Sequence, residues 1–418
     1  MRIIVVYLLA TAFVTTINGL MMHLSGGISA IGPIFHGLYS LCLIALGICH
    51  PGVKKNWLLI FIIYGLVLLI VIVQVYMGFS DGTLRDIGQL YKWYMPVMLF
   101  AVYYRWEYVR TSEGQKTLSR VFQKLPLIYS GLIIFSASTY FLFGFNPTLF
   151  PDGTLRFTGF SWGYNSTINV FFICGYVNYL FFQSSTSDRL VNLIAFLLLN
   201  SKTAVAYFAL VAWSYVERLM RSLKLRQKTV ILLIALPFLT AVIGIGYKQS
   251  LRAADASGDF TAAGQEVDST LLLRALTNSR FAWYSFMWDD VADWPIINLM
   301  FGNGTNVDRR KLNPLWDIKI GSNWYSDAKL DKTDKAIELD VLGHLDMLGL
   351  LAAIVFALVF YVYPFYSIKL PRFYLYQIFL IILSMLGGHM INNPQTGVLI
   401  VFFYLFLSGY SHSHFHHS

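Results

Sequence analysis

The sequence predicts an all-α integral membrane protein that carries one polar lobe. Of its 418 residues, 56% are apolar and only 13% are charged, whereas an ordinary soluble domain is about 25% charged. Most of the chain consists of uncharged apolar runs of roughly 16 to 24 residues, the length that a helix needs to cross a bilayer. One stretch, 248–346, holds 15 of the 22 Asp and Glu residues. We therefore predict a membrane bundle over 1–247, a lobe over 248–346, and further membrane helices with a short tail over 347–418.

Twelve membrane segments are predicted, one from each apolar run. They are 3–22, 30–49, 57–77, 89–104, 125–145, 161–183, 189–200, 203–216, 229–247, 347–366, 373–390 and 396–411. The connections before the third, fifth, seventh, ninth and eleventh segments are basic. Their cations are Lys54, Lys55, Arg105, Arg110, Lys116, Arg120, Lys124, Arg189, Arg218, Arg221, Lys224, Arg226, Lys228, Lys369 and Arg372. By the positive-inside rule these connections and both termini are cytoplasmic, and the lobe is on the outer face.

The first segment, behind Arg2, resembles the apolar core of a signal peptide. Its removal would leave an odd number of crossings against the charge pattern, so we expect it to be retained. The stretch 190–216 is apolar apart from Lys202, and both of its flanks are predicted to be cytoplasmic. Its 27 residues make only about 40 Å of helix, too short for two crossings of about 30 Å. We expect two short spans or a re-entrant hairpin with Lys202 at its tip, because non-helical backbone at that depth must line protein or a wet cavity.

The distribution of charge and cysteine argues against several classes of partner. The net charge of +9 divides into −4 for 248–346 and +13 for the remainder, so the positive net charge follows from membrane topology. Cys42, Cys49 and Cys174 lie within apolar runs, where a thiol behaves as a small hydrophobe. The sequence therefore predicts no nucleic-acid partner, no disulfide framework and no metal site.

Several cations are predicted on the outer side, against the positive-inside bias. They are Arg85, Arg156, Lys202, Arg274 and Arg280. Each could simply pair with a local acid or extend to lipid headgroups. Together they are suited to a phosphate site, because Arg presents a planar fork to phosphate oxygens and Lys supplies a point charge. The stretch 269–290 holds Arg280 near the membrane surface, either as an interfacial amphipathic helix or as a core helix of the lobe.

Acidic residues come directly before the tenth segment. Glu338 and Asp340 are followed by His344, and a helix that begins before its apolar part would place Asp340 and His344 on one face. Such carboxylates are commonly solvated acids that the helix dipole favours at a helix start. Alternatively one of them is a general base, since glycosyl transfer to a sugar hydroxyl requires a group that accepts its proton. Phe301-Gly302-Asn303-Gly304 is predicted to be a tight turn, without the spacing of a nucleotide-binding loop.

The order of these features resembles the Wzy-type polysaccharide polymerases of the O-antigen ligase and polymerase superfamily. Their pattern has Arg-x-x-Gly before a span, Ser-Lys at a hairpin, Ser-Arg and Gly-x-Gly in one large loop, and Glu-x-Asp before a span that opens Leu-Gly-Leu. Here these are Arg156 to Gly159, Ser201-Lys202, Ser279-Arg280, Gly302 to Gly304, and Glu338 to Asp340. Trp283 is closer to Ser279-Arg280 than the family pattern has it. The resemblance covers most of the chain from about residue 80.

The resemblance implies a C-type glycosyltransferase bundle in a bacterial inner membrane, with its active site facing the periplasm. It implies that donor and acceptor are both glycans on undecaprenyl pyrophosphate, that no metal or other cofactor is needed, and that the flippase and chain-length regulator of the same pathway are partners. Pyrophosphate would be held by Arg156, Arg280 and Lys202, with Arg274 and Arg85 as further candidates. Asp340 or Glu338 would accept the hydroxyl proton, with His344 nearby.

Two other functions stay open at this point. An O-antigen ligase would use the same donor and transfer the glycan to lipid A core. Ligases usually have a His-Asn pair where this chain has Glu338-Leu339-Asp340, and this difference favours the polymerase. A transporter would predict internal repeats and ionisable residues in mid-membrane, whereas the two halves of this chain show no similarity and no long span contains an acid.

Overall fold

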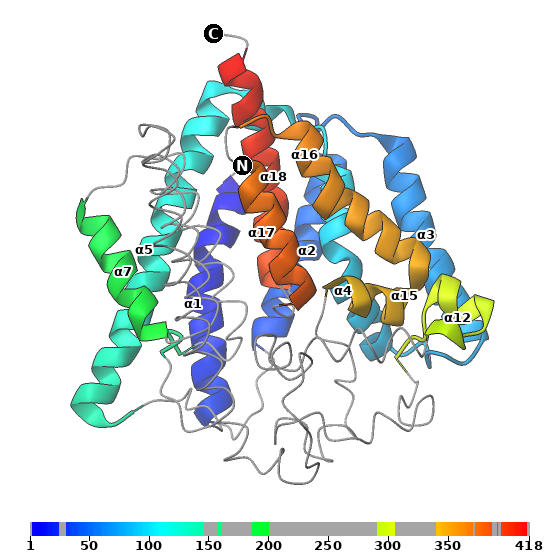
Figure 1. The fold of residues 1–418 in the computed structure, drawn as a ribbon, viewed down its shortest axis with the longest axis horizontal. Helices are drawn as coiled ribbons and strands as arrows, with labels where there is room; N and C mark the ends of the chain where they lie inside the picture. The colour runs from blue at the N-terminus through cyan, green and yellow to red at the C-terminus, as the bar shows by residue number, and fades with distance from the viewer. Residues whose placement is uncertain are drawn as a thin grey trace, which may run out of the picture. The chain divides into compact units, whose positions relative to one another are not determined.

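The described part of the chain is built from helices and contains no β-strand (Figure 1). The computed structural model describes residues 2–24, 31–145, 157–160, 186–199, 291–305, 340–370, 373–386, 391 and 394–415. Over these ranges the prediction of an all-α protein is confirmed.

The helices follow the predicted apolar segments closely at most positions. They are α1 (Arg2–Leu24), α2 (Ile31–Cys49), α3 (Trp57–Tyr76), α4 (Leu84–Tyr103), η1 (Glu107–Arg110), α5 (Ser112–Phe143), α7 (Thr186–Leu199), α12 (Ile296–Phe301), α15 (Asp340–Ala357), η4 (Leu358–Val362), α16 (Tyr363–Ser367), α17 (Phe373–Leu386) and α18 (Pro394–Phe415). The predicted segments 161–183, 203–216 and 229–247 lie outside the described residues.

Four stretches of described helix are long and apolar enough to cross a bilayer. They are Arg2–Met21, Trp57–Tyr76, Ser112–Phe143 and Asp340–Ser367. Two shorter apolar helices, Ile34–Cys49 and Thr396–Ser411, lie within α2 and α18. Large apolar side chains such as Leu58 and Phe61 are about 70% exposed, which fits a surface covered by lipid instead of water. The chain is therefore a membrane protein.

α5 (Ser112–Phe143) begins well before the apolar segment 125–145 that is predicted to cross the membrane. Lys116, Arg120 and Lys124, which were expected in a connection, lie in the first turns of the helix. The cause is the cap at Thr111, whose Oγ1 accepts the Gly114 N–H at 3.1 Å. Capping, which does not depend on apolar residues, therefore extends the helix beyond its apolar part.

α4 is the central helix of the described bundle. It begins after Thr83, whose hydroxyl accepts the Asp86 N–H at 3.2 Å, and it contains Pro96. Every residue from Trp93 to Tyr103 is buried, and α4 packs against α2, α3, α15 and α18. α4 therefore runs through the centre of the described helices.

Three of the predicted basic connections lie together at one end of the described bundle. Val53 pairs with Trp106 in an isolated bridge, and the neighbouring Lys54 forms an exposed ion pair with Glu107. The Lys369 N–H donates to Ser411 Oγ at 2.9 Å near the end of α18, which also packs against η1. The other end of α3 lies about 30 Å away, since its 20 residues rise about 1.5 Å each. Connections that were predicted to share one side of the membrane thus lie together.

A π-helical turn interrupts the span that begins with α15. This turn, η4, leads into α16 and contains Phe360. The Phe360 carbonyl accepts from Gln377 Nε2 of α17 at 2.6 Å, and Tyr404 OH of α18 donates to Gln377 Oε1 at 2.8 Å. All three residues are fully buried, so this chain of hydrogen bonds joins three helices inside the apolar bundle.

The chain divides into two compact units. One contains Met1–Ala204, Pro295–Val307 and Glu338–Ser418, and the other contains Val205–Trp294 and Asp308–Ile337. Every helix named above belongs to the first unit. The predicted lobe 248–346 lies mostly outside the described residues, which include only its parts 291–305 and 340–346.

Candidate functional site

A turn after α12 crosses the backbone of α15 at a break in that helix. The break is at Gly349 (φ 84°, ψ 177°), and Gly302 in the turn has nearly the same conformation (φ 80°, ψ 172°). Only glycine adopts this region readily. A Cβ on Gly349 would lie 2.3 Å from the Met300 carbonyl oxygen, and one on Gly302 would lie 2.6 Å from that of Met347. The contact is reciprocal, and we call this pair of glycines the glycine crossing.

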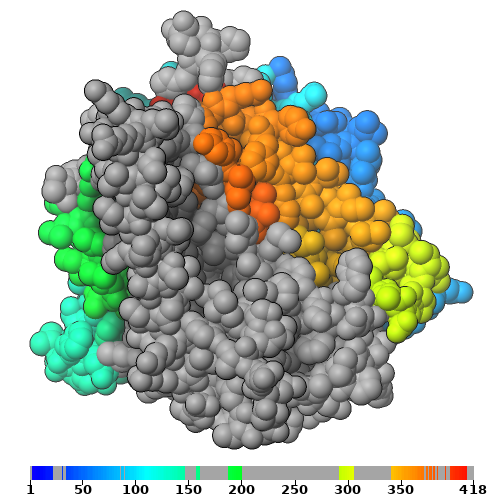
Figure 2. Space-filling view, viewed as in Figure 1, coloured from blue at the N-terminus to red at the C-terminus, as the bar shows by residue number. Residues whose placement is uncertain are grey.

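The crossing divides α15 into two parts. At the position of the tight turn predicted at 301–304, α12 ends and Gly302 and Gly304 both have positive φ. The break itself was not predicted, since the apolar pattern continues through Leu348-Gly349-Leu350. As a result, the residues from Asp340 to Leu348 form a short helix of their own before the rest of the span. α12 lies at the surface beside α15 (Figures 1 and 2).

Gln74, near the end of α3, donates hydrogen bonds to both of the backbone segments that meet at the glycine crossing. Its Nε2 donates to the carbonyls of Phe301 at 2.6 Å and Met347 at 2.7 Å. These two acceptors fix the orientation of the amide, because a flipped amide would place oxygen against oxygen. Oε1 is buried and has no hydrogen-bond partner among the described residues, which costs about 1 to 3 kcal/mol. A Cβ on Gly304 would lie only 3.1 Å from that oxygen.

Asn303 connects the turn to Asp346 through two hydrogen bonds. Its N–H donates to the Asp346 carbonyl at 2.7 Å, and its Nδ2 donates to Asp346 Oδ1 at 3.0 Å. Its own Oδ1 accepts from Asn298 Nδ2 at 2.9 Å. Asn303 and Asp346 are both buried, and a buried carboxylate requires such partners. The turn is therefore fixed on the short helix by side chains as well as by backbone contact.

Asp340, the first residue of α15, is fully buried. Its Oδ2 accepts the Ile391 N–H at 3.0 Å, so the carboxylate also orients the connection between α17 and α18. The helix begins before its apolar part, which is the condition under which Asp340 and His344 share one face. A solvated acid at a helix start does not describe Asp340, because none of its surface is exposed.

His344 follows one turn later and is also fully buried. Nδ1 lies 2.7 Å from the Asp340 carbonyl oxygen, and Nε2 lies 3.0 Å from the carbonyl oxygen of Trp93 in α4. The imidazole ring is tilted against Phe356 at 4.0 Å between centroids and meets Trp93 edge-on at 5.4 Å. The short helix is thereby joined to the central helix.

Most predicted site residues lie outside the described residues. These are Arg156, Lys202, Arg274, Arg280 and Glu338. Arg85 is the second residue of α4. Of the three predicted site residues that the structure describes, it brings Asp340 and His344 together.

The residues that directly follow Arg156 are held between three helices. The Phe157 N–H donates to the Leu198 carbonyl at 3.2 Å in the last turn of α7, and Thr16 of α1 donates its hydroxyl to the Gly159 carbonyl at 3.1 Å. A Cβ on Gly159 would lie 3.0 Å from Leu132 of α5. Phe157 is the residue after Arg156, and Leu198 is four residues before Lys202. One backbone hydrogen bond thus joins the two segments from which these predicted phosphate ligands come.

The sequence prediction missed Gln74 and the side-chain role of Asn303. Gln74 had a signal, because it is the one amide near the end of the otherwise apolar run 57–77, and polar residues in membrane segments are commonly functional. Asn303 was included only as part of a turn. Its partner Asp346 lies 43 residues away, and local sequence does not reveal such a contact.

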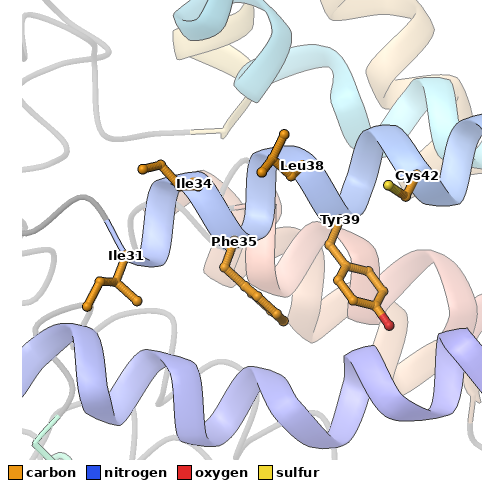
Figure 3. A pocket seen from close by; sticks show the side chains of 6 residues that line it. All are labelled: Ile31, Ile34, Phe35, Leu38, Tyr39 and Cys42. Atoms are coloured by element: carbon orange, nitrogen blue, oxygen red, sulfur yellow. The ribbon is translucent and has the colours of Figure 1, made fainter.

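An apolar hollow of about 570 Å³ lies beside α2 (Figure 3). It is lined by Ile31, Ile34, Phe35, Leu38, Tyr39 and Cys42. None of the acidic or amide residues of the crossing lines it. Within the described ranges, no three His, Cys, Asp or Glu side chains gather as a metal site would require.

Chemically, the short helix offers two buried carboxylates and one imidazole within seven residues. Their hydrogen-bond partners include backbone groups of α4 and of residue 391, and the side-chain amide of Asn303. Such an arrangement can hold a proton acceptor at a defined position where the turn meets the span. Comparisons with protein families, with curated proteins and with solved structures find no match to this chain.

Proposed function

We propose that this chain is a polysaccharide polymerase of the inner membrane, a glycosyltransferase that joins oligosaccharide units carried on undecaprenyl pyrophosphate. It has twelve spans in a C-type bundle, both termini in the cytoplasm, and its active site at the periplasmic face. The observation that carries the proposal is the contact between the Gly302-Asn303-Gly304 turn and the short helix from Asp340 to Leu348. These are two of the sequence motifs on which the resemblance rests, and they pack together although about 40 residues separate them.

The donor pyrophosphate binds to cations of the outer side. Arg156, Arg280 and Lys202 hold it, and Arg274 and Arg85 assist. The bond between Phe157 and Leu198 supports this grouping, because it joins the Arg156 segment to the helix that precedes Lys202. Preorganised cations stabilise the negative charge that develops on the leaving pyrophosphate, which is usually the largest single contribution to catalysis.

The acceptor is a sugar hydroxyl of a second lipid-linked unit. Its oxygen attacks the anomeric carbon of the donor sugar while the bond from that carbon to the pyrophosphate oxygen breaks. The bonding electrons leave with undecaprenyl pyrophosphate, and in-line attack inverts the anomeric centre. Asp340 or Glu338 accepts the hydroxyl proton. The burial of Asp340 and its bond to Ile391 support a carboxylate of fixed orientation at this position.

A deletion strain tests the reaction by what accumulates on surface glycolipid. A polymerase joins units before another enzyme attaches them to the final carrier, so deletion should leave single units still attached to that carrier. Gel separation of the glycolipid reveals this directly. Bare carrier together with long chains on undecaprenyl pyrophosphate would identify a ligase and refute the proposal.

Amide isosteres then identify the base. Asp340→Asn and Glu338→Gln keep size and hydrogen bonding but cannot accept the proton, so one of them should reproduce the deletion pattern in a protein made at normal levels. Asp340→Asn is favoured, because Asn can still accept the Ile391 N–H and keep the fold. Glu113→Gln, at an exposed acid in the first turn of α5, is the matched control. Wild-type polymer from both test variants would exclude these carboxylates as the base.

A further inference from the structure

We infer that His344 is a positioning residue, which fixes the short helix of α15 against α4 and does not take part in proton transfer. This inference rests on the proposed function for its activity readout. It is carried by the surroundings of the imidazole: both ring nitrogens are directed at backbone carbonyls, and the ring lies against Phe356 and meets Trp93 edge-on.

The two contacts of the ring differ in what they join. A carbonyl oxygen only accepts, so each contact is a hydrogen bond when the facing nitrogen carries its proton. A proton on Nε2 makes the bond to Trp93, which links α15 to α4. A proton on Nδ1 makes the bond to Asp340, which stays within one helical turn. A general base needs a nitrogen lone pair within reach of the substrate proton, and both nitrogens of His344 face protein carbonyls at 3.0 Å or less.

The position of His344 is coupled to that of Asp340. They are one helical turn apart, and the Asp340 carboxylate holds Ile391. Release of His344 from Trp93 lets this turn shift, and a displacement of about 1 Å at reacting groups lowers the rate about 100-fold. The role of His344 is thus to keep the carboxylate in place.

Three substitutions separate positioning from chemistry. His344→Gln retains an amide N–H that reaches toward Trp93, His344→Asn retains one only toward Asp340, and His344→Phe keeps the ring packing without a donor. We expect polymer formation near the wild-type rate for His344→Gln, and a loss of about 10-fold to 100-fold for the other two. The loss should be in kcat with KM little changed, because the substrate contacts remain.

Thermal unfolding of the purified proteins in detergent supplies a second readout that does not depend on activity. Wild type and His344→Gln should unfold at similar temperatures, with His344→Asn and His344→Phe lower. A wild-type protein without polymerase activity but with this order of stabilities would overturn the proposed function and leave the link to Trp93 standing.

Other outcomes overturn the inference itself. One is a stable His344→Gln protein as inactive as His344→Phe, which would assign proton chemistry to the ring. Another is a His344→Phe protein equal to wild type in activity and stability, which would show that the hydrogen bond to Trp93 contributes to neither. A third is equal retention by His344→Asn and His344→Gln, which would show that the bond to Trp93 has no special role.

Discussion

Substitution of Gly349 by alanine should destabilise the protein strongly. The backbone at this position has φ 84° and ψ 177°, and a residue other than glycine is strained there by about 1 to 3 kcal/mol. The new Cβ would also lie 2.3 Å from the Met300 carbonyl oxygen and 2.5 Å from the Gly302 nitrogen. Both are backbone atoms, which cannot rotate away, and such overpacking costs about a further 1 to 3 kcal/mol. The expected loss is thus about 2 to 6 kcal/mol.

The loss of stability can be measured as a decrease in the midpoint temperature of thermal unfolding of the purified protein in detergent. At about 2 °C per kcal/mol, the midpoint should fall by about 4 to 12 °C. Gly131→Ala in α5 is the matched control, because a Cβ there would meet nothing within 4 Å. That variant should be unchanged or slightly more stable, since alanine favours a helix by up to about 1 kcal/mol over glycine.

The reciprocal contact makes a sharper test possible. Gly302→Ala should destabilise for the same reasons, since its Cβ would lie 2.6 Å from Met347 backbone atoms. Once one alanine has opened the crossing, the second has more room, so the double variant should lose less than the sum of the two single losses. An unchanged midpoint for Gly349→Ala, or strictly additive losses, would show that the two glycines do not share one close contact.

Three further predictions concern topology, phosphate binding and the buried polar chain. A reporter fused after Lys228 should report cytoplasm and one fused near Asp317 periplasm; a cytoplasmic signal at Asp317 contradicts the proposed site. Arg156→Ala should lower polymer formation about 30-fold to 1000-fold, with poor rescue by Arg156→Lys, which lacks the planar fork; normal polymer in cells would leave Arg156 a structural role. Gln377→Leu should lower stability by about 1 to 3 kcal/mol, because it leaves the Phe360 carbonyl without its 2.6 Å donor; unfolding in detergent measures this, and an unchanged midpoint argues against the bond.

The positions of the helices could be predicted from the sequence because their main signal is local. A run such as 57–77 is apolar throughout, and α3 occupies Trp57–Tyr76. The start of α5 could not be read from hydropathy, because a hydrogen bond to Thr111 determines it. That signal was present in the sequence as a capping residue followed by an acid, but the apolar pattern alone does not use it.

The candidate site was predictable only in part, because its contacts are mostly between side chains and distant backbone. Asp340 was identified as a carboxylate before a span, yet its partner, the Ile391 N–H, has no sequence signature. His344 was identified for its imidazole, whereas the structure pairs it with the Trp93 carbonyl. The break at Gly349 escaped prediction for a related reason: glycine within an apolar run is common, and only the chain that crosses it shows why it is needed.

The π-helical turn at Leu358–Val362 means that this span can change its length by one residue. A π-turn accommodates one residue more than an α-helical turn, so the side chains of the helix on either side keep their orientation about the helix axis. Deletion of one residue within the turn would return it to a plain α-helix without rotating α16, and the Phe360 carbonyl would no longer be available to Gln377. The same deletion within the α-helical part of α15 would rotate every later side chain by about 100°. The span can therefore shorten by one residue at the π-helical turn without rotating α16, and the polar link to α17 is what such a deletion would remove.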